Sequence, residues 1–385
     1  MPADCLSVAG KMSPFIFQNH MLLANEGESF LSLNVPQPLK AAVHKLLPAK
    51  AGRKVSALWH FRSRFPWALK MAMTEGRPDS LIYFGISPGD DLLCTAVLHE
   101  LAIRRREKNW MMSNYPELFA GNTSVAYVVP VEDRYREYAG LFGSKYEFLQ
   151  YAAVSPEQDM SVPPARHIIA ELCASAKITG RIALRPYFFT TETEKKKYNW
   201  AQGMIAIQSS GLAAKQPMRN KQWFPERFQE VVSSLKRDFK FVQLGSAGDP
   251  PLNDVVDLRG KTSIRESAAV LANCRLQVGT VGFLMHLARA VECPAVIIYG
   301  GREAPWQSGY GCNVNLYSAV PCAPCWLWNR CDYNRVCMDT ITAQEVIGAV
   351  EQIASQKRDS LKVEYYELTP NAGERLPFNT VRALD

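Results

Sequence analysis

Two adjacent aspartates are the first candidates for catalysis in this chain of 385 residues. Asp90 and Asp91 follow Ser87-Pro88-Gly89, directly after an apolar segment, 81–86, that has the pattern of a β-strand. A carboxylate at such a strand-to-helix turn lies at the carboxyl end of the sheet, where open α/β folds bind ligands. There it could accept a proton from a hydroxyl nucleophile. The alternative is that either aspartate only caps the helix expected over 91–105.

A lysine and a polar turn could bind an anion in the second half of the chain. Lys221 lies in Asn220-Lys221-Gln222-Trp223-Phe224-Pro225, ahead of a helix expected from Pro225. A lysine beside such a turn can neutralise a diphosphate leaving group as a point charge, without metal. An upstream strand ends in Ser209-Ser210-Gly211, whose hydroxyl and amide groups could contribute. On spacing alone, a solvated surface lysine is the alternative.

A glycine turn lies between Gln277 and Gly301, where the chain reads as a strand, a turn, a helix and a second strand. The turn is Gly279-Thr280-Val281-Gly282, and the helical pattern after it contains Met285 and His286. Such a unit directs backbone N–H groups and a helix N-terminus at an anion, usually phosphate. Glycine is expected there because it permits close backbone approach and positive φ.

Four cysteines have the spacing of a metal site. Cys322, Cys325, Cys331 and Cys337 form C-x2-C-x5-C-x5-C, and four thiolates could hold zinc or iron tetrahedrally. Cys312 is a substitute ligand. The alternative is a set of reduced structural cysteines in a loop, with an occasional disulfide between Cys322 and Cys325. Such a metal would be structural.

The elements that position these residues form two successive runs of α/β rhythm, which predict two Rossmann-like domains facing across a cleft. The polar run 190–197 indicates a solvated connection between them, and a capping box at 342–345 predicts a helix through 353. The predicted divisions are a basic N-terminal extension (1–76), an N-terminal acceptor domain (77–190), a C-terminal donor domain with a Cys-rich loop at 312–338 (191–355), and a C-terminal tail (356–385).

Composition and charge predict a cytoplasmic protein. Hydrophobic residues make up 47% and charged residues 21%, which is typical of a soluble globular protein. We find neither a signal sequence nor an apolar run long enough to span a bilayer. The net charge of +7 is uneven, since 38–74 mixes basic and aromatic residues and has no acidic one. That stretch could contact an anionic membrane, a glycan or, less favourably, nucleic acid; solvated helices are the alternative.

The order of these motifs resembles glycosyltransferase family 9, the ADP-heptose heptosyltransferases. The family's Lys-x-Trp-Pro, Leu-x-Gly-Lys-Thr-Ser-Leu and Met-His-Leu-Ala-x-Ala stretches have counterparts at 221–225, 258–264 and 285–290. Its Gly-Asp-x-Leu turn corresponds to 89–93. The likeness covers about residues 80–353 and is stronger in the C-terminal half.

The resemblance implies a GT-B fold and a metal-independent inverting reaction, with the donor held mainly by the C-terminal domain. By correspondence with the family's motif, Asp91 is the first candidate for the base that deprotonates the acceptor, and Asp90 is the alternative. Lys221 would stabilise the departing diphosphate. His286 would either bind the donor or orient the glycine turn. The full donor-binding set expected is Ser209, Ser210, Gly211, Lys221, Gly279, Thr280, Val281, Gly282, Met285 and His286.

One position departs from the family pattern. Heptosyltransferases usually have an aspartate in the glycine turn, bound to sugar hydroxyls, where this chain has Val281. The hydroxyl of Thr280 cannot replace a carboxylate as the acceptor of two hydrogen bonds. The exact sugar therefore stays open. A subset of the family, the autotransporter heptosyltransferases, modifies adhesin serines, carries extra N-terminal sequence and includes members that bind iron through a cysteine finger.

These observations predict transfer of a heptose or related sugar from a nucleotide-diphosphate sugar, ADP-heptose first, to a hydroxyl. The acceptor would belong to lipopolysaccharide or another surface glycan, or to an adhesin protein. The predicted location is cytoplasmic, with peripheral contact at the inner membrane face through 38–74, and homo-oligomers stay open. Alternatives are a catalytically silent binding or assembly module and, more weakly, a nucleic-acid binder.

Overall fold

The computed structural model describes residues 66–85, 87–105, 108–214, 216–356 and 361–369. The chain divides into two compact units, 1–74 and 75–385. Of the first unit the structure describes only residues 66–74, which are helical. The predicted basic extension, and the membrane contact through 38–74, therefore lie almost wholly outside the described residues.

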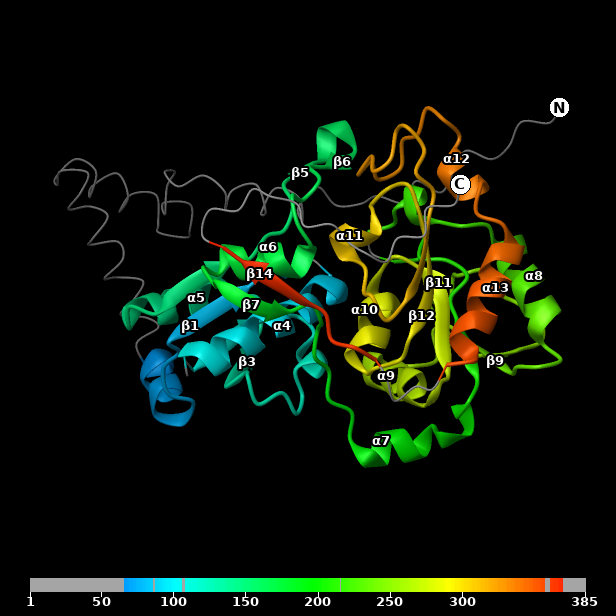
Figure 1. The fold of residues 1–385 in the computed structure, drawn as a ribbon. Helices are drawn as coiled ribbons and strands as arrows, with labels where there is room; N and C mark the ends of the chain where they lie inside the picture. Colours follow the sequence, from blue (N-terminus) through cyan, green and yellow to red (C-terminus); the bar gives the residue numbers. More distant parts are fainter. Residues whose placement is uncertain (1–65, 86, 106–107, 215, 357–360, 370–385) are drawn as a thin grey trace, which may run out of the picture. The chain divides into compact units, whose positions relative to one another are not determined.

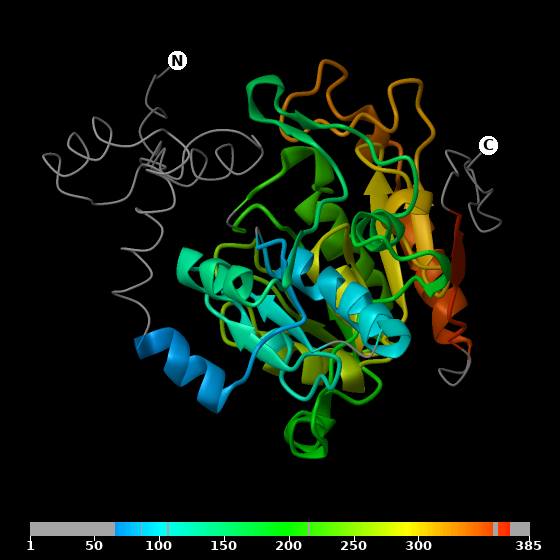
Figure 2. The ribbon, with the colours of Figure 1, turned by 90° about the vertical axis from the view of Figure 1, so that its left-hand side faces the viewer.

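The N-terminal half is built on a four-stranded parallel sheet with helices on both faces (Figures 1 and 2). Side chains alternate along the strands, so Ile82 and Met111 pack with helix α4 while Trp110 stacks on Tyr138 of helix α5. The sheet order is β3-β2-β1-β4. The bounds are β1 (Ser80–Tyr83), α4 (Pro88–Arg105), β2 (Asn109–Met112), β3 (Tyr127–Val129), α5 (Asp133–Leu141), β4 (Lys145–Phe148) and α6 (Ile168–Ser175).

This strand order contains a topological switch point. The chain moves from β1 outward to β2 and β3, and then returns to the other side of β1 to form β4. The carboxyl ends of β1 and β4 therefore lie side by side, which is where open α/β sheets bind ligands. Asp90 and Asp91 follow β1, and Tyr151 follows β4.

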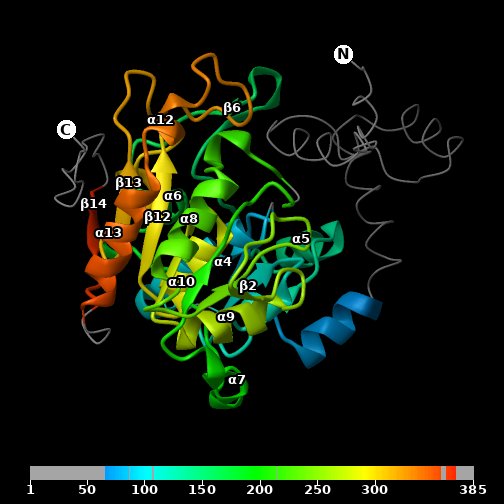
Figure 3. The same ribbon diagram turned by 90° about the vertical axis from the view of Figure 1, so that its right-hand side faces the viewer.

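The C-terminal half has a six-stranded parallel sheet in the order β10-β9-β8-β11-β12-β13. Its own switch point lies between β8 and β11. Helices α9 and α10 cover the face toward the N-terminal half, and α8 and α13 cover the opposite face (Figures 1 and 3). The bounds are β8 (Ile205–Ile207), α8 (Pro225–Leu235), β9 (Phe241–Gln243), β10 (Val255–Asp257), α9 (Ile264–Asn273), β11 (Leu276–Thr280), α10 (Phe283–Ala290), β12 (Ala295–Gly300), β13 (Val314–Tyr317) and α13 (Ala343–Ala354).

The predicted α/β fold with two Rossmann-like halves is thus confirmed. The central strands β11 and β12 are buried along their whole length, which explains why they read as continuous apolar runs. The capping box at Thr342 is present, and it opens α13 as expected. Among the described segments, no helix is both long and apolar enough to cross a membrane. Short 3-10 turns occupy Pro116–Leu118, Pro156–Gln158, Asn199–Ala201 and Arg219–Lys221.

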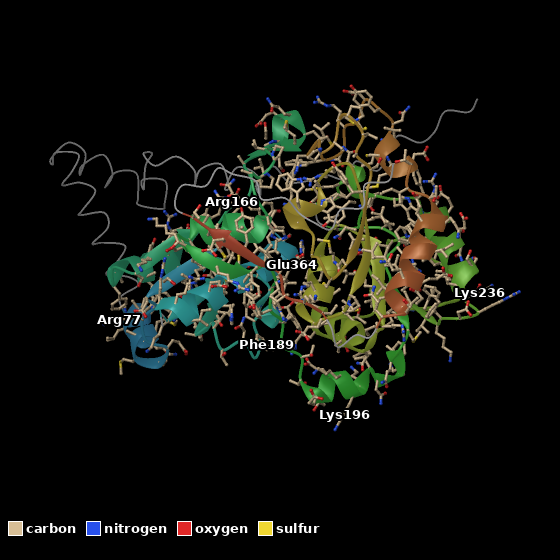
Figure 4. The ribbon with its side chains drawn as sticks, viewed as in Figure 1. Arg77, Arg166, Phe189, Lys196, Lys236 and Glu364 are labelled. Atoms are coloured by element: carbon tan, nitrogen blue, oxygen red, sulfur yellow. The ribbon has the colours of Figure 1, made fainter. Side chains whose placement is uncertain are left out.

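The connection between the halves is more ordered than the polar run 190–197 suggested. It forms helix α7 (Glu192–Lys197), capped by Thr191, and Figure 4 shows Lys196 on this helix, away from Phe189 where the connection begins. Arg265 of α9 pairs with Glu194 at 2.6 Å and donates to the backbone carbonyls of Glu117 and Phe189. The expectation of purely solvated charges is therefore wrong for Glu194, because α9 supplies it with a partner.

The described part of the predicted C-terminal tail contains a strand. β14 (Tyr365–Leu368) pairs antiparallel with β7 (Gly180–Ala183), so the chain returns to the N-terminal half after completing the second sheet. Glu364, labelled in Figure 4, accepts a hydrogen bond from the Gly311 N–H at 2.8 Å. The remaining residues of the tail lie outside the described ranges, apart from 356, 361–363 and 369.

Candidate functional site

The two aspartates at the start of α4 have different surroundings. Asp91 is fully buried, and its two carboxylate oxygens accept from the Gly85 N–H at 3.0 Å and from the Ser113 hydroxyl. These bonds close the turn after β1 and tie it to the end of β2. Asp90 keeps 9% of its surface exposed and accepts from the hydroxyls of Ser87 (2.8 Å) and Tyr151 (3.2 Å). Asp90 is therefore the aspartate that meets the neighbouring switch-point strand.

Burial perturbs both carboxyl groups. It raises the pKa of Asp91 to about 7, against the opposing hydrogen bonds from Ser113 and Gly85. It also raises the pKa of Asp90 above its ordinary value, and there the opposing effects are the hydrogen bonds from Ser87 and Tyr151 and the positive charge of Lys221. The charge of Lys221, in the C-terminal half, thus lowers the pKa of Asp90 in the N-terminal half. The structure brings these two predicted site residues together.

Lys221 belongs to a buried charge cluster that the sequence analysis missed. Its ammonium lies 2.8 Å from Glu303 Oε1, and the Arg302 guanidinium lies 2.9 Å from the same oxygen. Lys221 keeps 20% of its side chain exposed, whereas Arg302 and Glu303 keep 3% and 4%. The signal in the sequence was a pair of opposite charges directly after the fully buried strand β12.

The charges in this cluster depend on one another. Burial alone would raise the pKa of Glu303, but the charges of Lys221 and Arg302 outweigh it and hold that pKa at about 2. Burial lowers the pKa of Lys221, and Glu303 opposes that decrease. Glu303 is therefore ionised at neutral pH, and it supports the protonated state of Lys221.

The first turns of α4 and α10 contact each other beside this cluster. A Cβ placed on Gly89 would lie 3.7 Å from the Phe283 Cα. Helix α10 begins after Gly282, which provides no side-chain cap. Helix N-termini carry unpaired N–H groups and the positive end of the helix dipole. Two such ends meet here, one from each half, so the arrangement suits an anion.

The glycine turn differs in detail from the expectation. Neither Gly279 nor Gly282 has a left-handed φ, so the predicted positive φ is wrong. A Cβ on Gly279 would lie 2.6 Å from the Gln277 side-chain nitrogen, and glycine is accommodated there because it leaves room for that amide. Val281 and Thr280 are 5% and 4% exposed, and Val281 packs in the apolar core. The Val281 side chain thus supplies no polar group to a ligand.

Several other residues expected at the donor site are engaged within the fold. The Ser209 hydroxyl donates to the Pro250 carbonyl at 2.6 Å, and the Ser210 hydroxyl and Gly211 N–H both donate to Gln222 Oε1. Met285 is fully buried. Ser209, Ser210 and Gly211 therefore shape the turn after β8 at the switch point, while Met285 is a core residue.

Two buried histidines border the charge cluster. His286 of α10 lies 2.7 Å from the Tyr310 hydroxyl, and burial lowers its pKa to about 3 despite the opposing charge of Glu303. His167 caps α6 through the Ile169 N–H and lies 3.0 Å from the Gly309 carbonyl, with a pKa that burial lowers to about 4. Both imidazoles are neutral near pH 7. His286 was predicted from its helix motif, whereas His167 was not, because its partner is 142 residues away in the chain.

The cysteine loop adjoins the cluster. Cys322, Cys325, Cys331 and Cys337 line one small pocket together with Gly301, Arg302 and Asn220. The Cys325 and Trp326 N–H groups donate to the carbonyls of Gly301 and Arg302 at 3.1 and 2.8 Å. Within the described part of the chain, however, no three His, Cys, Asp or Glu side chains converge closely enough to hold a metal ion. The four thiols thus share a pocket without forming a ligating group.

The loop also joins the two halves. The hairpin β5 (Val154–Ser155) and β6 (Met160–Ser161) of the N-terminal half packs along it, as Figure 1 shows near α12 (Val336–Asp339) and α11 (Pro305–Ser308). Trp328 donates from its indole to Ser161 and from its backbone to the Asp159 carbonyl. Asp159 accepts from the Arg330 N–H at 2.6 Å. The loop therefore bridges the halves next to Arg302.

Comparison with known proteins agrees with this geometry. Residues 189–327 match the model of glycosyltransferase family 9 (heptosyltransferase). This range contains Lys221, the glycine turn, Glu303, and Cys322 and Cys325 of the proposed metal set. It confirms the resemblance deduced from the motifs. No curated protein matches the chain at the level of sequence.

Solved structures with the same fold include E. coli ADP-heptose lipopolysaccharide heptosyltransferase II, which is 16% identical with a TM-score of 0.53 and aligns over 71% of this chain and 98% of its own. The iron-containing dodecameric glycosyltransferase TibC of enterotoxigenic E. coli is 17% identical with a TM-score of 0.56, and it aligns over 72% of this chain and 76% of its own. A TibC complex with ADP-D-beta-D-heptose is 14% identical with a TM-score of 0.51, and it aligns over 72% of this chain and 76% of its own. These similarities show that the fold is GT-B.

Proposed function

We propose that this protein transfers a sugar from a nucleotide-diphosphate donor to a hydroxyl acceptor, with inversion at the anomeric carbon, because residues 189–327 match the model of glycosyltransferase family 9 (heptosyltransferase). The observation that carries the proposal is that Asp90 of the N-terminal half lies close enough to Lys221 of the buried charge cluster for the charge of each to shift the pKa of the other. Each follows the carboxyl end of a switch-point strand, β1 or β8, in its own sheet.

In the proposed reaction Asp90 takes the proton of the acceptor hydroxyl as its oxygen attacks the anomeric carbon. The bond from that carbon to the diphosphate oxygen breaks, and the diphosphate leaves with the bonding electron pair. Lys221 and the N-termini of α4 and α10 stabilise the negative charge that develops on it. The raised pKa of Asp90 makes it a stronger base than an ordinary carboxylate.

Asp90, rather than Asp91, is the base in this proposal. Both oxygens of Asp91 are occupied by bonds inside the turn, and the residue is fully buried. Asp90 is partly exposed and is the aspartate whose pKa responds to Lys221. Asp91 then positions the turn that presents Asp90. This reverses the order of preference that motif spacing alone suggested.

For the donor we propose ADP-heptose, because the family is described as heptosyltransferases and the TibC complex contains ADP-D-beta-D-heptose. The acceptor is a hydroxyl of a surface glycan such as lipopolysaccharide or of an adhesin protein. Transfer would take place in the cytoplasm or at the inner membrane face. A homo-oligomer is consistent with the dodecameric relative.

The test is donor turnover, measured as ADP release from ADP-heptose in the presence of candidate acceptors. Asp90→Asn should lower kcat by a factor of about 100 or more while ADP still binds. Lys221→Ala should weaken ADP binding, whereas Lys236→Ala, which removes a solvent-exposed ion pair with Asp254, should not. Full activity in Asp90→Asn with loss only in Asp91→Asn would reject the assignment of the base. ADP binding without turnover by any acceptor would favour a silent binding module.

We also propose that the four cysteines hold a structural zinc or iron ion, which would draw together thiols that line one pocket but do not converge in the described structure. The shared pocket supports this, and thiolates suit either metal. A bound ion would tie Cys322 and Cys325 to Cys331 and Cys337 and so hold the loop that joins the halves. Elemental analysis of the purified protein and of Cys331→Ser should show about one ion per chain in the first and loss of it in the second. Equal metal content in both would reject the site.

A further inference from the structure

We infer that Glu303 is a positioning residue that holds Lys221 and Arg302 side by side as a two-cation receptor for the donor diphosphate. This inference rests on the proposed function, and it assigns roles to two residues outside the motifs of the sequence analysis. Arg302 becomes a second diphosphate ligand. Glu303 acts only through the two cations.

The geometry supports a shared anchor. Both cations bond to one oxygen, Glu303 Oε1, at 2.8 and 2.9 Å. Glu303 and Arg302 are almost completely buried, and the guanidinium of Arg302 lies over the Trp326 ring at 4.7 Å from its centre. Neither side chain can therefore swing away easily. Lysine has four rotatable bonds, and a fixed carboxylate is what holds its ammonium in one place.

Arg302 has an unused hydrogen-bond donor. Its Nε is buried and has no hydrogen-bond partner within the described ranges, although Nη1 is bound to Glu303. An unpaired buried donor is costly in a folded protein, and a ligand oxygen would satisfy it. A guanidinium suits phosphate oxygens because its donors form a planar fork. Lys221 and Arg302 together carry two positive charges, whereas Glu303, the carboxylate that anchors both, carries one negative charge.

The charge state of Lys221 also depends on Glu303. The charged and titratable groups around its ammonium are Glu303 and Arg302 after β12, Asp90 of α4 with Tyr151 beside it, and His286 of α10. Burial and Arg302 favour loss of the Lys221 proton, and Glu303 is the strongest group that opposes this. Removal of the Glu303 charge would therefore make Lys221 lose its proton at lower pH.

The experiment measures the dissociation constant of ADP by calorimetry from pH 6 to pH 9 for the wild type and for Glu303→Gln, Glu303→Asp, Glu292→Gln and Lys221→Ala. Glu303→Gln should bind ADP at least about tenfold more weakly at pH 8, with its alkaline loss of affinity displaced to lower pH by about one unit. Glu303→Asp keeps the charge, so its affinity should be intermediate and its alkaline limb close to that of the wild type. Glu292→Gln, which removes an exposed carboxylate paired with Arg185, should match the wild type.

The outcomes separate two failures. If wild-type protein does not bind ADP, the proposed function is wrong and this inference fails with it. If the wild type binds ADP and Lys221→Ala weakens binding, but Glu303→Gln binds equally well or more tightly, only the inference is overturned, because Glu303 would then be a mere counter-ion. Should Glu303→Gln not fold in thermal unfolding, Glu303→Asp decides, and wild-type affinity in that variant would overturn the inference.

Discussion

The surroundings of Asp91 predict how the stability of the protein changes with pH. Its pKa in the folded protein is about 7, against an ordinary value of 3.8, because burial disfavours its charged form. A raised pKa means that the folded state binds the proton more tightly than the unfolded state does. The stabilisation from this proton is complete below about pH 4 and is lost as the pH rises through 7.

The substitution Asp91→Asn should remove this pH dependence. An amide oxygen can still accept from the Gly85 N–H, and the amide NH2 can donate to the Ser113 hydroxyl oxygen, so the turn keeps two hydrogen bonds. Each pKa unit corresponds to about 1.4 kcal/mol. Between pH 5.5 and 7 the free energy of unfolding of the wild type should therefore fall by about 2 kcal/mol relative to the variant, and then level off.

Urea unfolding at pH 5.5 to 8.5 measures this difference. The comparison with Asp91→Asn leaves Asp90 in both proteins, so most of its contribution cancels, since its charge is the smallest of the effects on the Asp91 pKa. Asp238→Asn, at an exposed position after α8, is the control and should run parallel to the wild type at every pH. If the curves for Asp91→Asn and wild type also stay parallel across this range, the buried carboxyl does not bind a proton there in the folded protein, and the argument from its burial is refuted.

Three further substitutions test the scaffold through shifts of the urea midpoint. Arg265→Ala removes the pairing with Glu194 and two bonds to backbone carbonyls, and should cost about 1–3 kcal/mol; no change would mean that the connection does not depend on it. Gly260→Ala should lower the free energy of unfolding by about 1–3 kcal/mol more than Gly143→Ala does. Both glycines have a left-handed φ, but only a Cβ at position 260 would meet Ala247, at 2.7 Å. Equal losses of stability in the two variants would contradict this. Phe228→Ala removes a fully buried ring packed edge-on against Trp223, and should cost about 3–5 kcal/mol; less than 1 kcal/mol would contradict its place in the core.

Local patterns were enough to predict the α/β fold and the position of the turns. The strands β11 and β12 are buried along their length and read as apolar runs, and Thr342 with Glu345 marks the start of α13. Parallel sheets place their ligands at the carboxyl ends of strands, so Asp90, Asp91 and Lys221 could be named as candidates from their positions. Those features depend on neighbours in the sequence.

What the sequence could not supply depends on contacts between distant residues. The choice between Asp90 and Asp91 is decided by Ser113 and Tyr151, which lie 22 and 61 residues away from them. Glu303 reads as an ordinary surface charge until Lys221 is placed against it. Strand β14 has only four residues, and its partner β7 is more than 180 positions earlier in the chain. Such long-range pairings leave no periodic pattern in the local sequence.

The effect of the Lys221 charge on Asp90 implies that donor binding strengthens the base. The charge of Lys221 lowers the pKa of Asp90 against the larger effect of burial. A diphosphate bound to Lys221 would neutralise that charge and add negative charge nearby, so the pKa of Asp90 should rise further. The acidic limb of kcat, which reports the bound enzyme, should therefore lie at higher pH than the acidic limb of kcat/KM for the donor, which reports the free enzyme. In Lys221→Ala the two limbs should move closer together. Coincident limbs in the wild type, or a limb for kcat at lower pH, would mean that Asp90 and the diphosphate do not influence each other, and the base would then have to be sought elsewhere.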